Sequence, residues 1–227
     1  MSALTTKIIL GLDEGLLVEV PELKCRVHHG LVQPLMTLAA QAARAGFDLA
    51  VASSYRSFDR QLHIWNAKAR GARPLLDSAG VALDVCTLTE REIVFAILRW
   101  SALPGASRHH WGTDIDVYDK SRIPEHYALQ LTAAETQAGG PFAAFYQWLT
   151  PWLDTQTTGF YRPYALDSGG IAPEPWHLSY APLAQDFAQQ FSADSLRTQL
   201  QQTDIALKAT ILANLDEIIA RFVCNER

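Results

Sequence analysis

Two short segments of the sequence combine histidine with carboxylates in a way that suits metal chemistry. One covers residues 107–116 and has His109 in a predicted turn; the other covers residues 174–177, from Glu174 to His177. Two imidazoles and one carboxylate would leave the fourth tetrahedral position of zinc open for water, the arrangement that catalytic zinc sites use. Glu174 could then be the general base. Taken alone, a histidine before a strand is more often a hydrogen-bonded structural residue.

The carboxylate of such a ligand set would come from the strand that follows His109. Residues 113–118 alternate polar with apolar side chains, as a half-buried strand should, which places Asp114 and Asp116 on the same face. On this periodicity alone, either aspartate could bind the metal. His110 is the neighbouring alternative to His109.

The elements that must position these residues indicate an α+β fold, with a small, mainly antiparallel central sheet flanked by helices. Short apolar runs predict strands at 47–52, 113–118, 160–162 and 176–180. Helical periodicity and capping residues predict helices at 31–45, 57–70, 89–103 and 141–154. From residue 182 the pattern is helical twice more, with a break near Thr203.

Three separated segments carry patterns that occur together in one family. Residues 53–57 read S-S-Y-R-S and are followed by Gln61, residues 107–116 fit S-x-H-x-x-G-x-x-x-D, and residues 174–177 fit E-x-W-H. In this order they resemble the metallopeptidases of the D-alanyl-D-alanine carboxypeptidase type, which include the vancomycin-resistance carboxypeptidases and some phage endolysins. The match spans about residues 31–180, most of the chain.

The resemblance implies a role for each of the residues that match the family's motifs. It implies that His109, Asp116 and His177 are zinc ligands, and that Glu174 is the base that activates the attacking water. Arg56 would then contact the substrate or the oxyanion, because a guanidinium can clamp a carboxylate or stabilise developing negative charge.

Gln61 and Ser107 are lesser candidates as substrate contacts in the same cleft, with a purely structural role as the alternative. The chain departs from the family pattern at two positions, since Asp114 replaces an alanine and Arg108 replaces a common acid. Asp114 could hydrogen-bond a ligand histidine instead of binding metal. Arg108 either adds positive charge at the mouth of the site, which would favour an acidic substrate end, or is a solvated surface residue.

The composition fits a globular protein and argues against several kinds of partner. The 227 residues carry a net charge of −5, and the basic residues are scattered, so nucleic acid and anionic membranes are poor partners. No stretch approaches the roughly 18 apolar residues of a membrane span. The three cysteines, Cys25, Cys86 and Cys224, lack metal or redox spacing and are interpreted as reduced thiols.

We expect a zinc peptidase domain over residues 1–182 and a helical extension over residues 183–227 that packs on it. The apolar face of the extension must be covered, in a monomer or a weak homodimer. The apolar run at residues 8–12 is too short for the core of a signal peptide, so a cytoplasmic location is predicted, with a periplasmic one as the alternative.

The expected function is zinc-dependent removal of the terminal D-alanine, at a D,D- or L,D-bond, from peptidoglycan stem peptides. This substrate class comes from the resemblance alone. Related endolysins suggest an endopeptidase that cuts L-alanyl-D-glutamate bonds as the first alternative. A non-catalytic, zinc-stabilised peptidoglycan-binding module is the second, although a pure binder has no need of Glu174 beside the metal.

Overall fold

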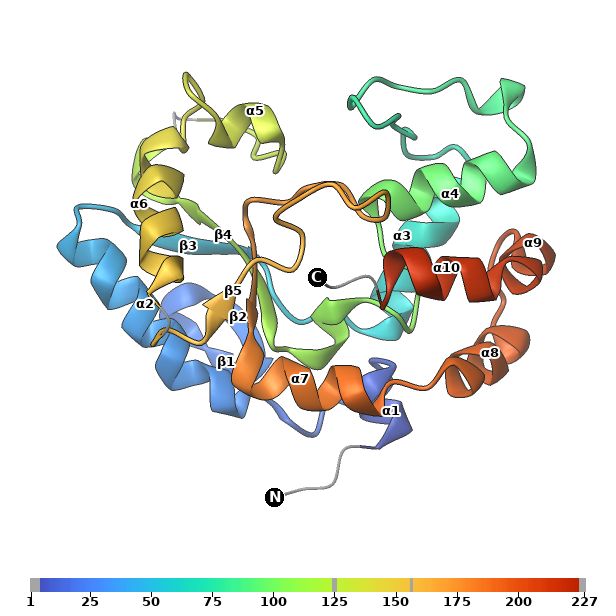
Figure 1. The fold of residues 1–227 in the computed structure, drawn as a ribbon, viewed down its shortest axis with the longest axis horizontal. Helices are drawn as coiled ribbons and strands as arrows, with labels where there is room; N and C mark the ends of the chain where they lie inside the picture. Colours follow the sequence, from blue (N-terminus) through green and yellow to red (C-terminus); the bar gives the residue numbers. More distant parts are fainter. Residues whose placement is uncertain (1–4, 124–125, 156, 225–227) are drawn as a thin grey trace.

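The strands of the protein form two antiparallel sheets in a computed structural model that describes residues 5–123, 126–155 and 157–224 (Figure 1). The small sheet pairs β1 (Leu17–Val20) with β2 (Cys25–His28). The larger sheet has the order β3-β4-β6-β5, formed by β3 (Leu49–Ser53), β4 (Asp114–Asp119), β6 (His177–Tyr180) and β5 (Phe160–Tyr161). Helices flank both sheets, which confirms the α+β fold class.

The described residues also form ten α-helices, none of which is both long and apolar enough to cross a membrane. They are α1 (Thr6–Ile9), α2 (Val32–Arg44), α3 (Phe58–Ala69), α4 (Glu90–Trp100), α5 (Ala133–Thr136), α6 (Ala143–Asp154), α7 (Ala181–Gln190), α8 (Ala193–Gln202), α9 (Lys208–Ala213) and α10 (Leu215–Phe222). The predicted helices correspond to α2, α3, α4 and α6, and the four predicted strands are those of the larger sheet. Analysis of the sequence missed α1, α5, β1 and β2, which have four residues each and too few for a clear period.

The C-terminal prediction of two helices is wrong in number, because the described chain after β6 has four. The predicted break near Thr203 is present, since Thr203 ends α8. A second break comes at Ser192, whose side chain accepts a hydrogen bond from the backbone of Ser195 and so begins α8 as a new helix. A third falls at Asn214, between α9 and α10.

Strand β4 lies inside the larger sheet and is buried on both faces. Ile115 and Val117 are 0% exposed, as expected of its apolar face. The polar face is buried as well, with Asp114 at 0% and Asp116 at 4% exposure, so the prediction of a half-buried strand is wrong. Protein covers the polar face of the strand, and buried carboxylates require partners there.

Helices α2 and α6 cover the apolar side of the sheet. Leu35 and Leu38 from α2 and Phe145 from α6 belong to the same buried cluster as Ile115 and Val117 (Figure 1). Because side chains alternate along a strand, this packing directs Asp114 and Asp116 to the opposite side. The core therefore decides which way the polar residues of β4 point.

The C-terminal helices share a second core with α3 and α4, and Figure 1 shows α10 alongside α4. Trp65 of α3, Ile97 of α4, Ile211 of α9 and Ile218 of α10 are each 0% exposed. The indole N–H of Trp65 donates to the carbonyl of Ala206, 3.1 Å away, which ties α3 to the segment between α8 and α9. Apolar side chains of the extension are thus covered within the same chain.

Helix α7 follows β6 directly and packs on the N-terminal segment. Phe187 stacks on Trp111, with ring centroids 5.6 Å apart, and shares a buried cluster with Ile8 and Ile9. The predicted boundary between residues 182 and 183 falls inside this helix. The division into two domains stays a prediction, and its outermost residues, 1–4 and 225–227, lie outside the described part of the chain.

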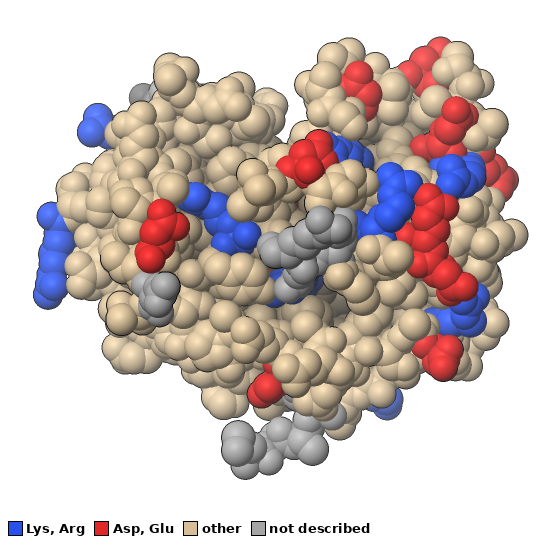
Figure 2. Space-filling model, in the orientation of Figure 1, with Lys and Arg blue, Asp and Glu red and all other residues tan. Residues whose placement is uncertain are grey.

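The surface is hollowed between the side that carries α5 and the side that carries α4 (Figure 2). On the face shown, most Lys and Arg side chains lie close to Asp and Glu rather than in a block of their own. The ion pairs of Glu217 with Arg91 and Arg221, at 2.6 and 2.8 Å, are examples of this mixing.

Substitutions in the second core test whether the C-terminal helices are integral to the fold. Ile211→Ala and Ile218→Ala should each lower the free energy of unfolding by about 2–5 kcal/mol, because each leaves a cavity in a closed core. Urea unfolding followed by circular dichroism measures this. Leu166→Ala is the control, since Leu166 is 82% exposed and its loss should have little effect. A separate early transition for the C-terminal helices would contradict a single cooperative unit.

Candidate active site

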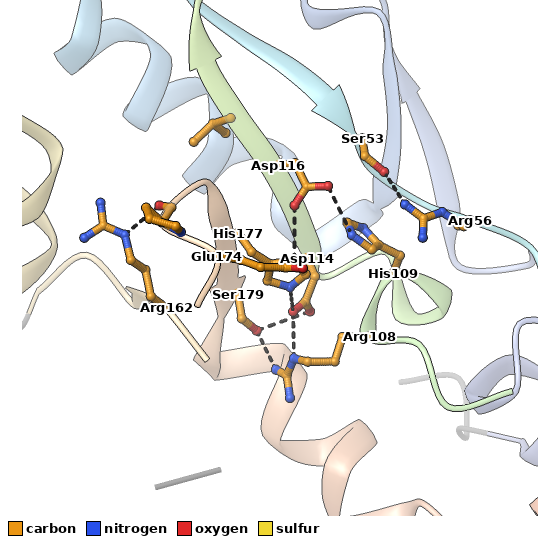
Figure 3. A network of polar contacts seen from close by, with 12 residues as sticks. Ser53, Arg56, Arg108, His109, Asp114, Asp116, Arg162, Glu174, His177 and Ser179 are labelled. Carbon is orange, nitrogen blue, oxygen red and sulfur yellow. Dashed lines mark hydrogen bonds and ion pairs between the residues drawn. The ribbon is translucent and has the colours of Figure 1, made fainter. Parts of the chain in front are cut away.

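Three predicted metal ligands come together on the polar side of β4. His109, Asp116 and His177 can each offer one ligand atom such that all three atoms lie within 4.8 Å of one another. Asp116 Oδ2 is 3.3 Å from His109 Nε2, and its Oδ1 is 3.1 Å from His177 Nδ1. All three side chains are buried, and Figure 3 shows them converging.

The pairing of the strands places two of these residues side by side. Asp116 on β4 is the register partner of His177 on β6 and of Ser53 on β3. Directly opposed residues on antiparallel strands have their Cβ atoms about 4.5–5.5 Å apart. Backbone hydrogen bonding between strands therefore brings a carboxylate and an imidazole together before their side chains interact.

His109 comes from a tight 3-10 turn, Arg108–Trp111, that ends at Gly112, two residues before β4 begins. Gly112 has φ +69°, and a Cβ atom there would lie 2.6 Å from the Leu17 side chain and 2.8 Å from the His28 nitrogen. Its carbonyl accepts a hydrogen bond from His28 N at 2.9 Å. Only glycine allows this left-handed turn against β2, which explains the glycine of the S-x-H-x-x-G pattern.

Asp114 orients His177 by a hydrogen bond, which is one of the two interpretations of Asp114 from the sequence. Asp114 Oδ1 lies 3.0 Å from His177 Nε2. Because an ionised carboxylate only accepts, Nε2 of His177 is the donor to Asp114, and Nδ1 is the ring nitrogen that faces Asp116. Asp114 is not among the residues that converge as a ligand set.

Both predictions for Arg108 are wrong, because it is neither at the mouth of the site nor solvated. It is 5% exposed and donates from Nε to Asp114 Oδ1 at 2.7 Å. Its Nη2 donates to Ser179 Oγ at 2.6 Å and to Tyr161 Oη at 2.9 Å. Burial opposes ionisation of Asp114, but Arg108 and His177 outweigh it and hold the pKa of Asp114 well below its usual range. The two departures from the family pattern therefore compensate each other.

Glu174 lies beside the ligand set, with Oε2 3.5 Å from His177 Nδ1 (Figure 3). Burial raises its pKa to about 7, and the charge of His177 works against this rise. Its backbone N–H donates to Tyr164 O at 2.9 Å, and Arg162 Nε donates to Pro175 O at 2.8 Å. A carboxyl group on an anchored backbone, with a pKa near 7, suits a general base.

Arg56 approaches the site from the opposite side, past the end of β3. Its backbone N–H donates to His109 O at 3.1 Å, which ties it to the ligand turn. Its guanidinium donates from Nη1 to Gln61 Oε1 at 2.8 Å and from Nη2 to Ser53 Oγ at 2.9 Å. These neutral acceptors leave the charge of Arg56 to act on Asp116, on Glu174 and on whatever enters the cleft.

Gln61 is placed behind Arg56 rather than in the cleft. It is 0% exposed, and its Nε2 donates to Ala102 O at 2.7 Å while its Oε1 accepts from Arg56. The predicted substrate contact at Gln61 is therefore replaced by a supporting role, because both ends of the amide are bonded within the protein. Ser107, the other predicted contact, stands at the start of the ligand turn and is 2% exposed.

His110, the alternative to His109, does not join the ligand set. Its Nε2 accepts a hydrogen bond from Gly105 N at 3.0 Å, so its proton is on Nδ1, which lies 2.6 Å from Arg56 O. Burial lowers its pKa to about 3, which keeps the ring neutral. Both ring nitrogens are used to hold the backbone around Arg56.

The converging residues fit a divalent cation of the zinc type. His109 Nδ1, Asp116 Oδ1 and His177 Nδ1 are buried without a hydrogen bond to any described residue. Two ligand atoms, each about 2 Å from one tetrahedral ion, would lie roughly 3.3 Å apart, close to the contacts seen. Burial lowers the pKa of His177, but Asp114 and Asp116 outweigh it and raise that pKa to about 10, which shows how strongly the site attracts positive charge.

Four side chains around the site were not found from the sequence. Ser179 stands two residues after His177 on β6, so strand periodicity alone could have placed it on the same face. Tyr164 packs its ring 5.0 Å from the His177 ring. Arg162 and Lys68 carry no motif: Arg162 donates to Pro175 O at 2.8 Å, and the charge of Lys68 interacts with that of Glu174.

Comparison with known proteins points to one family. A family model described as VanY, D-alanyl-D-alanine carboxypeptidase, matches residues 24–183. Two uncharacterised proteins of Haemophilus influenzae are similar: one is 32% identical over 126 residues, covering 53% of this chain and 92% of its own, and the other is 42% identical over 103 residues, covering 44% and 70%.

Two solved structures share the fold of this chain. The vancomycin-resistance D,D-pentapeptidase VanY, as a variant in complex with Zn(II), has 20% sequence identity and a TM-score of 0.50, covering 86% of this chain and 88% of its own. VanYB in complex with D-alanine-D-alanine has 21% identity and a TM-score of 0.52, covering 83% of this chain and 89% of its own.

A double-mutant cycle on Arg108 and Asp114 tests whether their charges compensate each other. Arg108→Met and Asp114→Ala should each lower the free energy of unfolding by about 3–5 kcal/mol, because each leaves a buried charge without its partner. The double variant should lose clearly less than the sum of the two. Urea unfolding of the four proteins gives the coupling.

The matched control is the exposed pair of Arg197 and Asp216, whose charged atoms are 2.8 Å apart and whose aspartate is 92% exposed. Water screens such a pair, so its cycle should show no measurable coupling. Additive losses at Arg108 and Asp114 would show that the two residues stabilise the fold independently.

Proposed function

The chain belongs to the VanY-type D-alanyl-D-alanine carboxypeptidase family, and we propose that it is a zinc-dependent carboxypeptidase that removes the terminal D-alanine from peptidoglycan stem peptides. Family membership makes it a peptidase. The zinc and the bond that is cut are our proposal, carried by the convergence of His109, Asp116 and His177 beside Glu174.

Each residue of the site has a defined task in this reaction. Zinc held by His109, Asp116 and His177 would supply Lewis acidity for a carbonyl and a water molecule. Glu174 takes the proton of the attacking water and returns it to the leaving amine, for which a pKa near 7 is well matched. Arg56 lies beside the ligand turn, where its N–H groups can donate to the carbonyl oxygen as that oxygen gains charge.

Two alternatives differ from this proposal in ways that can be measured. A non-catalytic binding module would have no use for a buried carboxyl with a raised pKa next to the ligand set. An endopeptidase would cut within the stem peptide instead of at its end. The D-alanine-D-alanine bound by the solved relative VanYB supports the carboxypeptidase.

The metal is tested by its stoichiometry. Purified protein should bind about one zinc ion per chain. His109→Ala, Asp116→Ala and His177→Ala should each lose the ion, because two remaining protein ligands are too few to hold it. Elemental analysis after dialysis measures the content. A metal-free wild type that stays metal-free when zinc is added would contradict the proposal.

Substitutions of the two aspartates of β4 should affect zinc binding differently. Asp116→Ala removes a ligand and should abolish zinc retention, whereas Asp114→Ala keeps all three ligands but removes the hydrogen bond that orients His177, so it should weaken zinc affinity about 10- to 100-fold. Competition with a chromogenic chelator gives both values. Full retention in Asp116→Ala with complete loss in Asp114→Ala would identify Asp114 as the true ligand.

Glu174→Gln separates an enzyme from a binder. The amide keeps the size and hydrogen-bonding reach of the side chain but not its basicity, so zinc content should be unchanged while the chemical step slows by about two to four orders of magnitude. Single-turnover hydrolysis of a stem pentapeptide measures it, with the exposed Glu22→Gln as the matched control.

Mass spectrometry of the products in the same assay identifies the bond. Release of free D-alanine supports the carboxypeptidase, and release of a longer fragment supports the endopeptidase. Unchanged turnover in Glu174→Gln would remove Glu174 from the mechanism.

A further inference from the structure

The loop that carries Glu174 joins β5 to β6 over residues 162–176, which form neither helix nor strand, and we call it the base loop. A hydrogen bond from Glu174 N to Tyr164 O, 2.9 Å long, closes its neck and joins its two limbs to each other. The tip, residues 165–173, contains two consecutive glycines and loses much conformational entropy when it is ordered. The position of the loop on the protein therefore depends also on what holds this tip.

Ile171 anchors the tip in the core of the C-terminal helices. It is 8% exposed and belongs to the buried cluster that contains Ile97 of α4 and Ile218 of α10. Ile171 stands three residues before Glu174 in the sequence. The same core that covers the apolar face of the extension thus receives a side chain from the loop that carries the proposed base.

Arg99, near the end of α4, holds the tip at several points. Its carbonyl accepts from Ala172 N at 2.9 Å, and its Nη1 donates to Gly170 O at 2.8 Å and to Asp167 Oδ1 at 2.9 Å. Its Nη2 pairs with the second oxygen of the same carboxylate, which makes the contact bidentate. The Arg99 side chain is only 12% exposed, so water competes little for these bonds.

Arg221, at the end of α10, reaches the tip from the other side. Its Nη2 donates to Gly169 O at 2.9 Å. Its Nη1 pairs with Glu217 at 2.8 Å, one turn earlier on the helix, and its guanidinium carbon lies 5.1 Å from the ring centroid of Phe95 on α4. Helix α10 lies beyond the residues that match the family model, so this contact belongs to the extension of the chain.

Open space beside the tip makes these two arginines more important. A cavity of about 440 Å³ lies where the base loop meets α4 and α10, and its lining includes Arg99, Asp167, Gly169, Gly170 and Arg221. On this side the tip has no continuous layer of side chains against it. Hydrogen bonds from the arginines therefore connect the loop to the two helices where packing does not.

We propose that Arg99 and Arg221 are positioning residues that dock the base loop on α4 and α10 and so hold Glu174 beside the metal ligands. The inference rests on the proposed function, in which Glu174 is the base. It deepens that function by giving the C-terminal extension a task in catalysis. Both arginines act through the loop, whose backbone carries Glu174 to its place.

Substitution of the two arginines should lower kcat and leave KM unchanged, because a displaced base slows proton transfer without releasing the substrate. Arg99→Met should lower kcat for a stem pentapeptide about 10- to 100-fold. Arg221→Ala removes one hydrogen bond to the tip, so the loss should be about 3- to 10-fold. Arg99→Lys keeps one donor and should recover part of the activity. Zinc content should match the wild type in all three.

Two matched controls separate docking of the loop from other effects of a lost charge. Glu217→Gln removes the ion pair of Arg221 but keeps its donor to Gly169. Arg197→Ala removes another arginine of the extension, which pairs with Asp216. Both variants should keep the kcat of the wild type.

The Glu174→Gln background shows whether the arginines act through the base. With the base already removed, Arg99→Met should cause little further loss in single-turnover hydrolysis, because two changes that act on one group are not additive. An equal fold-loss in both backgrounds would show that Arg99 acts elsewhere and would overturn the inference.

Hydrogen exchange tests the docking without any hydrolysis. In Arg99→Met and Arg221→Ala, peptides that cover residues 165–174 should exchange their amide hydrogens about 10-fold faster, while peptides of β4 keep the wild-type rate. If the wild type hydrolyses no stem peptide, the proposed function fails, and faster exchange would still support the docked loop. Unchanged exchange in both variants would overturn the inference, and so would faster exchange with the kcat of the wild type.

Discussion

The register between β4 and β6 is the constraint on which the site depends. It sets Asp116 opposite His177, so that these two can bind a metal, and Asp114 opposite Ser179, so that these two can support the ligands. Because side chains alternate along a strand, a slip of one residue would turn both aspartates into the apolar layer beneath α2 and α6. The core formed by those helices therefore specifies the chemistry on the other side of the sheet.

Charge balance is the second requirement of a site buried this deeply. Arg108 neutralises Asp114, which leaves the charges of Asp116 and Glu174 to face the ligand position. In the reaction we propose, a divalent cation would balance these two carboxylates, and the charge of Arg56 would make the site positive overall. Such a site favours an anionic substrate and an attacking oxygen that gains negative charge.

Local signals in the sequence predicted most of the elements, and the family pattern predicted the ligand set. The capping box of Thr89 and Glu92 and the cap at Ser57 operate within one turn, so α4 and α3 begin where predicted. Burial of the polar face of β4 could not be predicted in this way, because it depends on segments distant in sequence. The same is true of Gln61, whose amide is held by the carbonyl of Ala102, 41 residues away in the sequence.

The departures at Arg108 and Asp114 show why two positions can mislead when they are considered one at a time. An aspartate in place of the family's alanine suggests a competing ligand, and an arginine in place of an acid suggests a surface charge. In the fold they form one buried ion pair, and neither charge is tolerable there without the other. Together they fix His177 through a carboxylate that water does not reach, so the direction in which its Nδ1 points is set by the protein alone.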